Sequence, residues 1–598
     1  MATKIIPPEH ITKTEETYDK GYDPKVARGL MRFVNPYLGQ MLTSLVLMIF
    51  VTAAAVSGPY FVKLAIDDGI SQNNIIALRN TVSAFFVVNV LQLLANFARL
   101  RIMARVGQNV LFDVRTAMFD HLQNLSLSFY NRYSVGRVIT RVINDVGTLR
   151  EFVTWAVLAI VRNSLMIIGT LIAMVSLNFR LSAITLTVVP IMVLATILYR
   201  NIARRNYRKM RAAISWTNSV LAENVNGVRV VQAFSRQAYN FKKFSGYVNQ
   251  YQLETTLDAA KVASVFTPIV DVLGAIATAL VVYIGGTAVL GESITPGVLI
   301  AFVLYIDRLF GPIRDLSRRF DTFQSTMAGG ERILELLNTP VEVQDADDAK
   351  EMEAVSGDVR FEDVQFHYSD DPTLVLDGIN LNADKGQTLA LVGETGAGKT
   401  TIIKLLARFH DPTSGCVRMD GVDLQTVTQQ SLRRQIGMVL QDPFLFTGTV
   451  KENILFGRLD ANDEEVIAAA QAVGAHDFIM DLKNAYETKV EEGGVNLSVG
   501  QRQLLSFARA LLADPRILIL DEATSSVDTQ TEQVIQKALA TLLNGRTSFV
   551  IAHRLSTITN ADKIVVIHNG KIIEQGTHAA LLTNQGMYYE LYKTGFQE

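Results

Sequence analysis

Six long apolar runs in the first 310 residues constrain this chain more than any other feature of its sequence. Most of them are long enough to cross the hydrocarbon core of a bilayer, about 30 Å thick, which takes about 20 helical residues. The second run is interrupted by polar amides and the sixth by Asp307 and Arg308. A soluble helical domain would explain any single run, but not six at this density. The expected spans are Met41–Ala65, Thr81–Ala98, Phe152–Ser176, Leu181–Tyr199, Val262–Leu290 and Val298–Phe310.

Composition supports this assignment and excludes some partners. Hydrophobic residues make up 49% of the chain and charged residues only 19%, whereas soluble proteins carry about 25% charged residues. The net charge of −2 gives no reason to expect a nucleic-acid partner. Cys416 is the only cysteine, so no intrachain disulfide can form.

The distribution of basic residues predicts the orientation in the membrane. Arginine and lysine gather before the first run, after the sixth, and in the long connections between runs two and three and between runs four and five. The opposite loops, residues 67–80, 178–180 and 291–296, are short and hold few of them. Basic loops remain on the cytoplasmic side. We therefore expect a multi-pass protein of the cytoplasmic membrane with both termini and the C-terminal domain in the cytoplasm.

The long cytoplasmic connections keep helical apolar spacing, so the spans are expected to continue beyond the membrane and end in turns that contact the C-terminal domain. After about residue 340 the chain changes to short apolar strands that alternate with helices. The predicted fold class is a multidomain membrane protein, an all-α six-helix transmembrane domain followed by an α/β P-loop domain. The expected parts are an N-terminal segment with an elbow helix (1–37), the transmembrane domain (38–330), a linker (331–356) and the nucleotide-binding domain (357–598). Within the linker, residues 340–355 are expected to be acidic and exposed.

A glycine-rich loop carries the strongest chemical signal. It follows the apolar strand 388–392 and opens a helix, which is the context that a P-loop requires. Backbone N–H groups of such a loop surround phosphates, the lysine reaches the β- and γ-phosphates, and the hydroxyl after it binds Mg²⁺. The helix N-terminus adds its positive dipole end. The candidate ATP-binding residues here are Gly393, Glu394, Thr395, Gly396, Ala397, Gly398, Lys399, Thr400 and Thr401.

Two further segments fit the same chemistry. The apolar strand 517–520 ends in Asp521, suited to the Mg²⁺ shell, and Glu522, placed to deprotonate an attacking water. A positioned general base contributes about 10²–10⁴-fold to a rate. The polar turn Leu497–Gln501 opens another helix shortly before this strand, and a helix N-terminus binds anions.

This order of motifs resembles the ATP-binding cassette family, in particular the exporters in which six spans and one cassette form a half-transporter. The resemblance covers the chain from about residue 25 to its end. It implies that Tyr368 stacks on adenine, that Gln441 contacts Mg²⁺, and that Glu522 and His553 act in hydrolysis. The signature motif would be formed by Ser498, Val499, Gly500 and Gln501, and Ser525–Asp528 would pass between cassettes. Residues 129–145 and 223–227 resemble the two intracellular coupling segments.

The resemblance also implies a second chain. In this family the signature motif closes over the ATP held by the opposite cassette, and six spans form half of a pathway. The usual signature is Leu-Ser-Gly-Gly-Gln, and here Val499 replaces its first glycine. A complete catalytic set with an altered signature resembles one subunit of heterodimeric exporters, so a heterodimer is favoured and a homodimer remains the alternative.

The expected activity is ATP-driven export of hydrophobic or amphipathic compounds, such as drugs or lipids, by alternating access. A lipid flippase, an importer of iron chelates with the exporter fold, and a nucleotide-gated channel or regulator remain alternatives.

Asp271 lies within the fifth run, where a charge costs roughly 2.5–3.5 kcal/mol on insertion scales. It either binds a cationic substrate or forms an internal polar contact, for which Arg162 is a candidate.

Overall fold

The structure, a computed structural model, describes residues 23–151, 154, 157–318, 320–369, 371–521, 529–552 and 555–595. The chain divides into two compact units. The first contains residues 1–123 and 135–339, and the second contains residues 124–134 and 340–598. The short helix after α4 therefore belongs to the second unit, although its sequence neighbours belong to the first.

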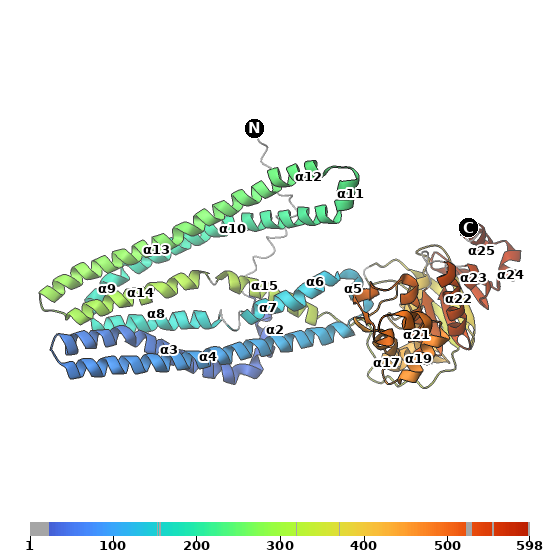
Figure 1. The fold of residues 1–598 in the computed structure, drawn as a ribbon, viewed down its shortest axis with the longest axis horizontal. Coiled ribbons are helices and arrows are strands. Elements are labelled where there is room, and N and C mark those ends of the chain that lie inside the picture. The colour runs from blue at the N-terminus through green and yellow to red at the C-terminus, as the bar shows by residue number, and fades with distance from the viewer. Residues whose placement is uncertain are drawn as a thin grey trace. The chain divides into compact units, whose positions relative to one another are not determined.

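The first unit is built of helices alone in its described part (Figure 1). Three of them, α4, α10 and α13, have 50, 39 and 41 residues. At 1.5 Å per residue, each exceeds the thickness of a bilayer core by about 25 Å or more, so the spans do continue beyond the membrane. The helices are α2 Pro24–Val34, α3 Leu38–Leu64, α4 Ile75–Asn124, α6 Val135–Thr140, α7 Val146–Glu151, α8 Val157–Leu177, α9 Phe179–Leu186, α10 Val188–Asn226, α11 Val228–Ala233, α12 Gln237–Lys243, α13 Gln250–Leu290, α14 Pro296–Arg318 and α15 Phe320–Leu337.

Six helical segments among the described residues are long and apolar enough to cross a membrane, and each overlaps one predicted span. Two amides of the second span have hydrogen-bond partners: Asn89 donates to the carbonyl of Phe85, and Asn96 accepts from Arg99. The expected start of the third span at Phe152 lies outside the described residues. The six segments are Pro24–Ile70, Ile75–Asn124, Leu158–Leu177, Phe179–Asn226, Gln237–Leu290 and Pro296–Ile313.

The apolar side chains of α4 point outward. The most apolar window of this helix has no buried residue, and Phe86, Leu93 and Phe97 are each more than 60% exposed. A monomeric soluble domain rarely exposes a continuous apolar face of this size. Lipid contact explains such a face, and the chain is a multi-pass membrane protein.

A buried carboxylate joins α3 to α14 at the end of the bundle opposite the basic connections. Asp67, in the π-helical turn Ala65–Ile70, accepts from the hydroxyl of Thr295 at 2.5 Å and from the backbone N–H of Gly297 at 2.8 Å. Lys63 forms an ion pair with the same carboxylate at 3.4 Å. Because the N–H of Gly297 lies in the first turn of α14, Asp67 also offsets the positive end of that helix. We call these three contacts the Asp67 cluster.

The second unit contains two main sheets. An antiparallel sheet has the order β2-β1-β4-β5, and a six-stranded sheet has the order β12-β11-β3-β10-β9-β6, in which only the pairing of the edge strand β12 is antiparallel. β7 and β8 form a separate pair. The strands are β1 Val359–Phe366, β2 Leu376–Ala383, β3 Thr388–Val392, β4 Ser414–Met419, β5 Val422–Asp423, β6 Ile436–Val439, β7 Gly448–Thr449, β8 Lys489–Val490, β9 Ile517–Asp521, β10 Thr547–Ile551, β11 Lys563–His568 and β12 Lys571–Gly576.

Helices surround the parallel sheet, and two hydrophobic cores fill the space between them. One core joins β3 and the helix after it to the antiparallel sheet. The other joins β9 to α19 and α21. The helices of this unit are α5 Leu127–Arg132, α16 Lys399–Leu406, α17 Gln429–Arg433, α18 Val450–Leu455, α19 Asp463–Ala472, α20 His476–Asp481, α21 Val499–Leu512, α22 Thr529–Leu543, α23 Leu555–Thr559, α24 His578–Asn584 and α25 Met587–Gly595.

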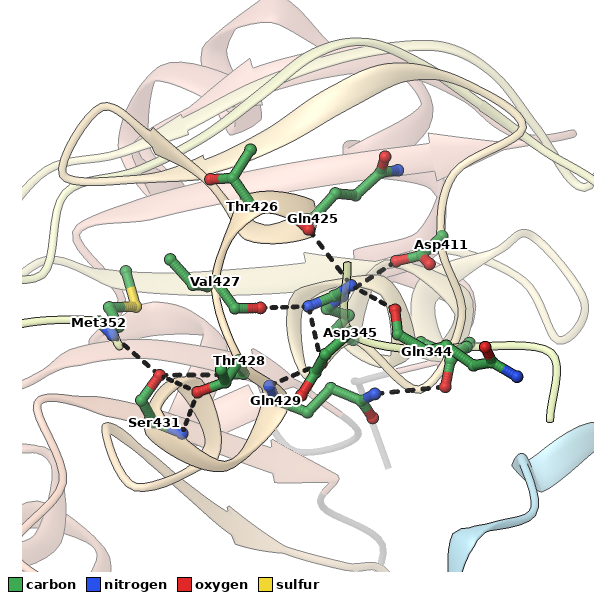
Figure 2. A network of polar contacts seen from close by, with 12 residues as sticks. Gln344, Asp345, Met352, Asp411, Gln425, Thr426, Val427, Thr428, Gln429 and Ser431 are labelled. Atoms are coloured by element: carbon green, nitrogen blue, oxygen red, sulfur yellow. Dashed lines mark hydrogen bonds and ion pairs between the residues drawn. The ribbon is translucent and has the colours of Figure 1, made fainter. Parts of the chain in front are cut away.

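Most residues of the segment 340–355 are exposed, in agreement with the expectation, but the segment is anchored at three buried apolar side chains. Val343, Met352 and Val355 are buried in the second unit, and helix α15 already occupies the expected linker up to Leu337. Much of the attachment comes from Arg408, whose side chain is buried. Figure 2 labels its partners Gln344, Asp345, Asp411, Gln425 and Val427. The guanidinium of Arg408 donates to the carbonyls of Gln344, Gln425 and Val427 and forms ion pairs with Asp345 and Asp411. We call these contacts the Arg408 cluster.

Candidate nucleotide site

The carboxyl ends of four neighbouring parallel strands bring the candidate residues to one edge of the sheet. The glycine-rich loop follows β3, Asp521 ends β9, and Gln441 lies two residues after β6. β10 lies between β3 and β9, and its residue Ile551 pairs directly with Asp521. Ligands of open α/β sheets bind at this edge. The strand order therefore places three sequence-distant segments on one side of the domain.

The glycine-rich loop adopts backbone conformations that L-residues with a side chain avoid. Gly393 has φ +154° and Gly398 has φ +110°. A Cβ atom at Gly393 would lie 2.2 Å from the carbonyl oxygen of Ile567, and one at Gly398 would lie 2.7 Å from a methyl group of Leu376. Both positions thus require glycine for steric as well as conformational reasons. The loop ends where α16 begins, at Lys399.

Lys399 is buried inside this loop. Its Nζ donates to the carbonyls of Gly393 and Glu394 at 2.7 and 2.9 Å, which are the residues that begin the loop. Burial lowers the pKa of Lys399, and the negative charge of Asp521 opposes that shift. An ammonium group held this way closes the loop upon itself. The N–H of Ala397 donates to the carbonyl of Glu394, and the N–H groups at the start of α16 form a helix N-terminus that suits an anion.

Tyr368 and Thr401 are in direct contact. The phenol oxygen of Tyr368 lies 3.2 Å from the hydroxyl oxygen of Thr401, and its ring packs edge-on against His410 at a centroid distance of 5.4 Å. Lys404 lies 5.7 Å from the same ring. Burial, together with the charge of Lys404, lowers the pKa of His410. The sequence analysis missed His410, because no motif marks a histidine that supports another aromatic ring.

The predicted signature residues lie on another element, the start of α21. Ser498 and Gln501 form a capping box, in which the serine hydroxyl accepts from the N–H of Gln501 and the glutamine oxygen accepts from the N–H of Ser498. Gly500 is buried, and Val499 is 41% exposed. Within the described part of the chain, no hydrogen bond connects these residues to the glycine-rich loop. The structure thus does not bring the signature to the loop of its own chain.

Several predicted site residues lie outside the described residues. These are Glu522, His553 and the Ser525–Asp528 loop. Their neighbours fix where the chain enters and leaves them: Glu522 follows Asp521 at the end of β9, and His553 comes two residues after the end of β10. Their roles remain predictions.

A contact absent from the sequence analysis joins the short helix α5 to the linker. Glu342 accepts from the hydroxyl of Ser128, from the guanidinium of Arg132 at 2.6 Å and from the hydroxyl of Ser369 at 3.4 Å. Ser369 follows Tyr368 directly. Burial raises the pKa of Glu342, but the hydrogen bond from Ser128 and the charge of Arg132 outweigh it, and the pKa is lowered. We call this group the Glu342 contact.

The second predicted coupling segment is held by a hydrogen bond within its own unit, in which Asn224 accepts from the side-chain amide of Asn240 on α12 at 2.7 Å. The predicted residues 223–227 end α10, and the short helix α11 follows as a turn between α10 and α12. Val230, Phe234 and Phe241 at this turn are 62%, 72% and 72% exposed. The second unit also exposes an aromatic cluster, in which the ring of Phe446 packs against those of Phe444 and Phe456. Both the turn and the cluster present exposed apolar side chains.

Comparisons with known proteins agree with this arrangement. Residues 41–313 match the family described as ABC transporter transmembrane region, and residues 376–525 match the family described as ABC transporter. The chain is 40% identical over 588 residues to an uncharacterized ABC transporter ATP-binding protein, YknV, of Bacillus subtilis, covering 98% of this chain and 96% of that one. It is 37% identical to the putative multidrug export ATP-binding/permease protein YgaD of the same organism, covering 95% and 99%. It is 34% identical to an ATP-dependent lipid A-core flippase of Syntrophus aciditrophicus, covering 96% and 95%.

Proposed function

Because this chain belongs to the ABC transporter family, as an ATP-hydrolysing half-transporter, we propose that it exports hydrophobic or amphipathic compounds across the cytoplasmic membrane by alternating access. The observation that carries the proposal is the union, in one chain, of six apolar helices and a phosphate-cradling loop. Two relatives are named as a putative multidrug export protein and a lipid A-core flippase, and these names support both drugs and lipids as substrate classes.

The proposed ATP site uses the residues gathered at the sheet edge. The loop from Gly393 to Thr401 holds the phosphates, with Lys399 turning from the loop carbonyls to the β- and γ-phosphates, and Tyr368 packs on the adenine. The oxygens of Thr400, Gln441 and Asp521 form a hard donor set that suits Mg²⁺. When bound, that ion would neutralise charge that develops on the phosphates. Glu522 would orient and deprotonate the attacking water, and His553 would contact the γ-phosphate.

The active unit in this proposal contains two chains. Ser498, Gly500 and Gln501 of one chain would close over the ATP of the other, in keeping with the lack of a contact to their own loop. The exposed turn at α11 and the aromatic cluster around Phe446 are apolar surfaces that a second chain would cover.

We favour a heterodimer over a homodimer. Val499 stands in the first turn of α21, where the family has glycine, and its side chain is exposed on the face that would meet the partner's nucleotide. A valine there adds bulk beside the γ-phosphate, so the site formed with this signature would be the weaker one. Copurification of a tagged chain from its native host, followed by mass determination of the complex, distinguishes a second gene product from a second copy.

The orientation follows from the basic residues of the long connections. Both termini and the nucleotide-binding unit are placed in the cytoplasm, and the Asp67 cluster on the opposite side. Import of iron chelates and nucleotide-gated regulation remain the rival functions, and neither is favoured by an observation on this chain.

The proposal is tested with Glu522→Gln in proteoliposomes that contain the native partner chain. Loss of the general base should lower ATP hydrolysis by about 10²–10⁴-fold and stop accumulation of a fluorescent amphiphile, with ATP binding retained. Glu464→Gln, at an exposed carboxylate on α19, is the matched control and should hydrolyse and transport normally. Hydrolysis without accumulation in the wild type would favour the regulatory alternative, and near-normal hydrolysis by Glu522→Gln would refute its assignment as the base.

A further inference from the structure

The helix bundle of the first unit encloses a polar cavity. Its volume is about 550 Å³, and its walls come from five helices, α3, α4, α8, α13 and α14. Sites for small ligands commonly range from about 300 to 1,000 Å³. Besides the hydroxyls of Thr52 and Thr267, the polar side chains of the wall are Gln92, Asn96, Arg162, Asn163, Arg308 and Asp315.

Positive charge predominates in this cavity. It is lined by two guanidinium groups, Arg162 and Arg308, and by one carboxylate, Asp315. The ion pair of Arg162 with Asp315 is long, at 3.8 Å, and both side chains are more than 40% exposed, so their attraction is weak. Arg308 forms no ion pair with a described residue, although the exposed Asp307 beside it attracts its charge. Behind the wall, the buried Arg99 adds a third guanidinium.

Buried polar atoms of the wall lack partners among the described residues. The amide nitrogen of Asn163 and the hydroxyl of Thr52 are both buried without a hydrogen bond, and their residues are 2% and 5% exposed. A buried donor without an acceptor costs about 1–3 kcal/mol, and the low dielectric of a bundle raises the cost of an uncompensated charge. A ligand that brings negative charge would compensate the guanidinium groups of this wall.

An apolar pocket adjoins the polar cavity. Its volume is about 420 Å³, and Ile49, Val56, Leu165, Ile168 and Ile172 form much of its wall. Thr52 lines both spaces. On α8 and α14 the polar residues occupy the ends next to the basic connections, and the apolar residues occupy the opposite ends. The two spaces together are therefore polar at one end and apolar at the other.

We propose that these spaces bind an amphiphile with an anionic headgroup, a phosphate or a carboxylate, and an alkyl chain. The planar guanidinium groups of Arg162 and Arg308 match the oxygens of such a headgroup, and the apolar pocket receives the chain. This inference rests on the proposed export function, since it names the substrate class of the same pathway. It differs from the expectation of a cationic substrate at Asp271, whose side chain is exposed on α13 and which is absent from the residues named for either wall.

The test measures binding without nucleotide, with the full-length protein and its copurifying partner in phosphatidylcholine nanodiscs. Labelled dodecyl phosphate is displaced by unlabelled dodecyl phosphate, dodecyltrimethylammonium or inorganic phosphate. We expect dodecyl phosphate to bind at least about tenfold more tightly than the cationic amphiphile, a difference of about 1.4 kcal/mol. Equal affinity of the two amphiphiles would overturn the proposal, and so would equal displacement by inorganic phosphate, which would indicate a site for the free anion.

Variants assign the binding to this cavity. Arg308→Gln should weaken dodecyl phosphate binding about tenfold, and Arg308→Lys should retain most of it. Arg105→Gln, at an exposed arginine of α4, is the matched control. Asp315→Asn removes the only carboxylate named in the wall and should strengthen binding, so the proposal stays testable if Arg308→Gln does not fold. An unchanged affinity in Asp315→Asn and in a folded Arg308→Gln would refute it. Because no nucleotide is present, a failure of export leaves this result unaffected.

Discussion

At the scale of single residues, the carboxylate of Glu342 joins three segments that are far apart in the sequence. It accepts from Ser128 and Arg132 on α5 and from Ser369 beside Tyr368. In the proposed function, α5 belongs to the intracellular connection of the spans, and Tyr368 contacts adenine. In the proposed transporter, this one side chain would connect the intracellular helix α5 to the residue that follows the adenine-binding tyrosine.

Replacing this carboxylate should loosen α5 without affecting the phosphate loop. Glu342→Gln removes the ion pair and weakens two hydrogen bonds, a loss of about 1–2 kcal/mol. We expect backbone amides of Leu127–Arg132 to exchange hydrogen about tenfold faster, with ATP affinity unchanged. Hydrogen exchange with mass spectrometry measures this. Glu362→Gln, at another arginine-paired carboxylate of the same unit, should leave α5 unaffected, and unaltered exchange in Glu342→Gln would contradict the role.

The same contact predicts the pH range over which α5 stays protected from hydrogen exchange. The pKa of folded Glu342 is lowered, so its contribution to stability is fully present above the ordinary glutamate value, about 4.3, and is lost as the pH falls through the lowered value. Exchange at α5, corrected for intrinsic rates, should therefore be constant from pH 8 to pH 5. A loosening within that range in the wild type, absent from Glu342→Gln, would show that the carboxylate titrates higher than its contacts imply.

At the scale of elements, the Arg408 cluster attaches the linker to the second unit, and the sequence did not predict this attachment. The segment 340–355 is acidic and resembles an exposed connection, but its acidic and backbone oxygens meet one buried guanidinium from the end of the P-loop helix (Figure 2). Arg408 is 63 residues away from Asp345. Local composition cannot reveal a partner at that distance, and no sequence motif marks it.

Removing the guanidinium should release the linker. Arg408→Met keeps the apolar stem but leaves the carbonyls of Gln344, Gln425 and Val427 without this donor, at a cost of about 3 kcal/mol. We expect faster limited proteolysis within residues 340–355 and a lower midpoint for thermal unfolding of the nucleotide-binding unit. Arg434→Met, at a nearby exposed arginine, controls for loss of charge. Wild-type proteolysis in Arg408→Met would show that buried apolar residues alone hold the linker.

The parts of the fold that the sequence predicted correctly are those set by local patterns. Six apolar runs predicted six candidate spans, and the pattern around the glycine-rich loop predicted the strand 388–392 before it and the helix after it. The contacts that were missed, at Glu342, His410 and Arg408, depend on side chains brought together by tertiary packing. Alternating hydrophobic and polar residues show which elements are buried, but they carry no information about which distant polar group lies opposite.

At the scale of the whole molecule, the exposed turn at α11 is an apolar surface that the proposed dimer would cover. In the proposed dimer, Phe234 at the end of α11 is covered by the partner. Phe234→Asp places a charge in that interface and should lower the fraction of assembled complex and the ATPase rate by at least about tenfold. Crosslinking and ATPase assays on the same membranes measure both.

Two controls accompany this substitution. Ile573→Asp, at an exposed apolar residue on the edge strand β12, should leave assembly unchanged, because no interface is proposed there. ATP binding by Phe234→Asp should remain normal, since α11 and the phosphate loop belong to different units. Full assembly of Phe234→Asp would remove this turn from the proposed interface.

The Asp67 cluster has a consequence for the speed of the pump. Under the proposed orientation it lies on the outer side, where the turn after α3 is joined to the start of α14 by two hydrogen bonds to Asp67. If these helices part when the pathway opens outward, both hydrogen bonds break together, whereas the ion pair of Lys63 with Asp67 stays within the α3 segment. The energy barrier that the two hydrogen bonds create would then govern two rates at once. One is the rate at which substrate is released to the outside, and the other is the rate at which the resting protein lets substrate leak through the pathway.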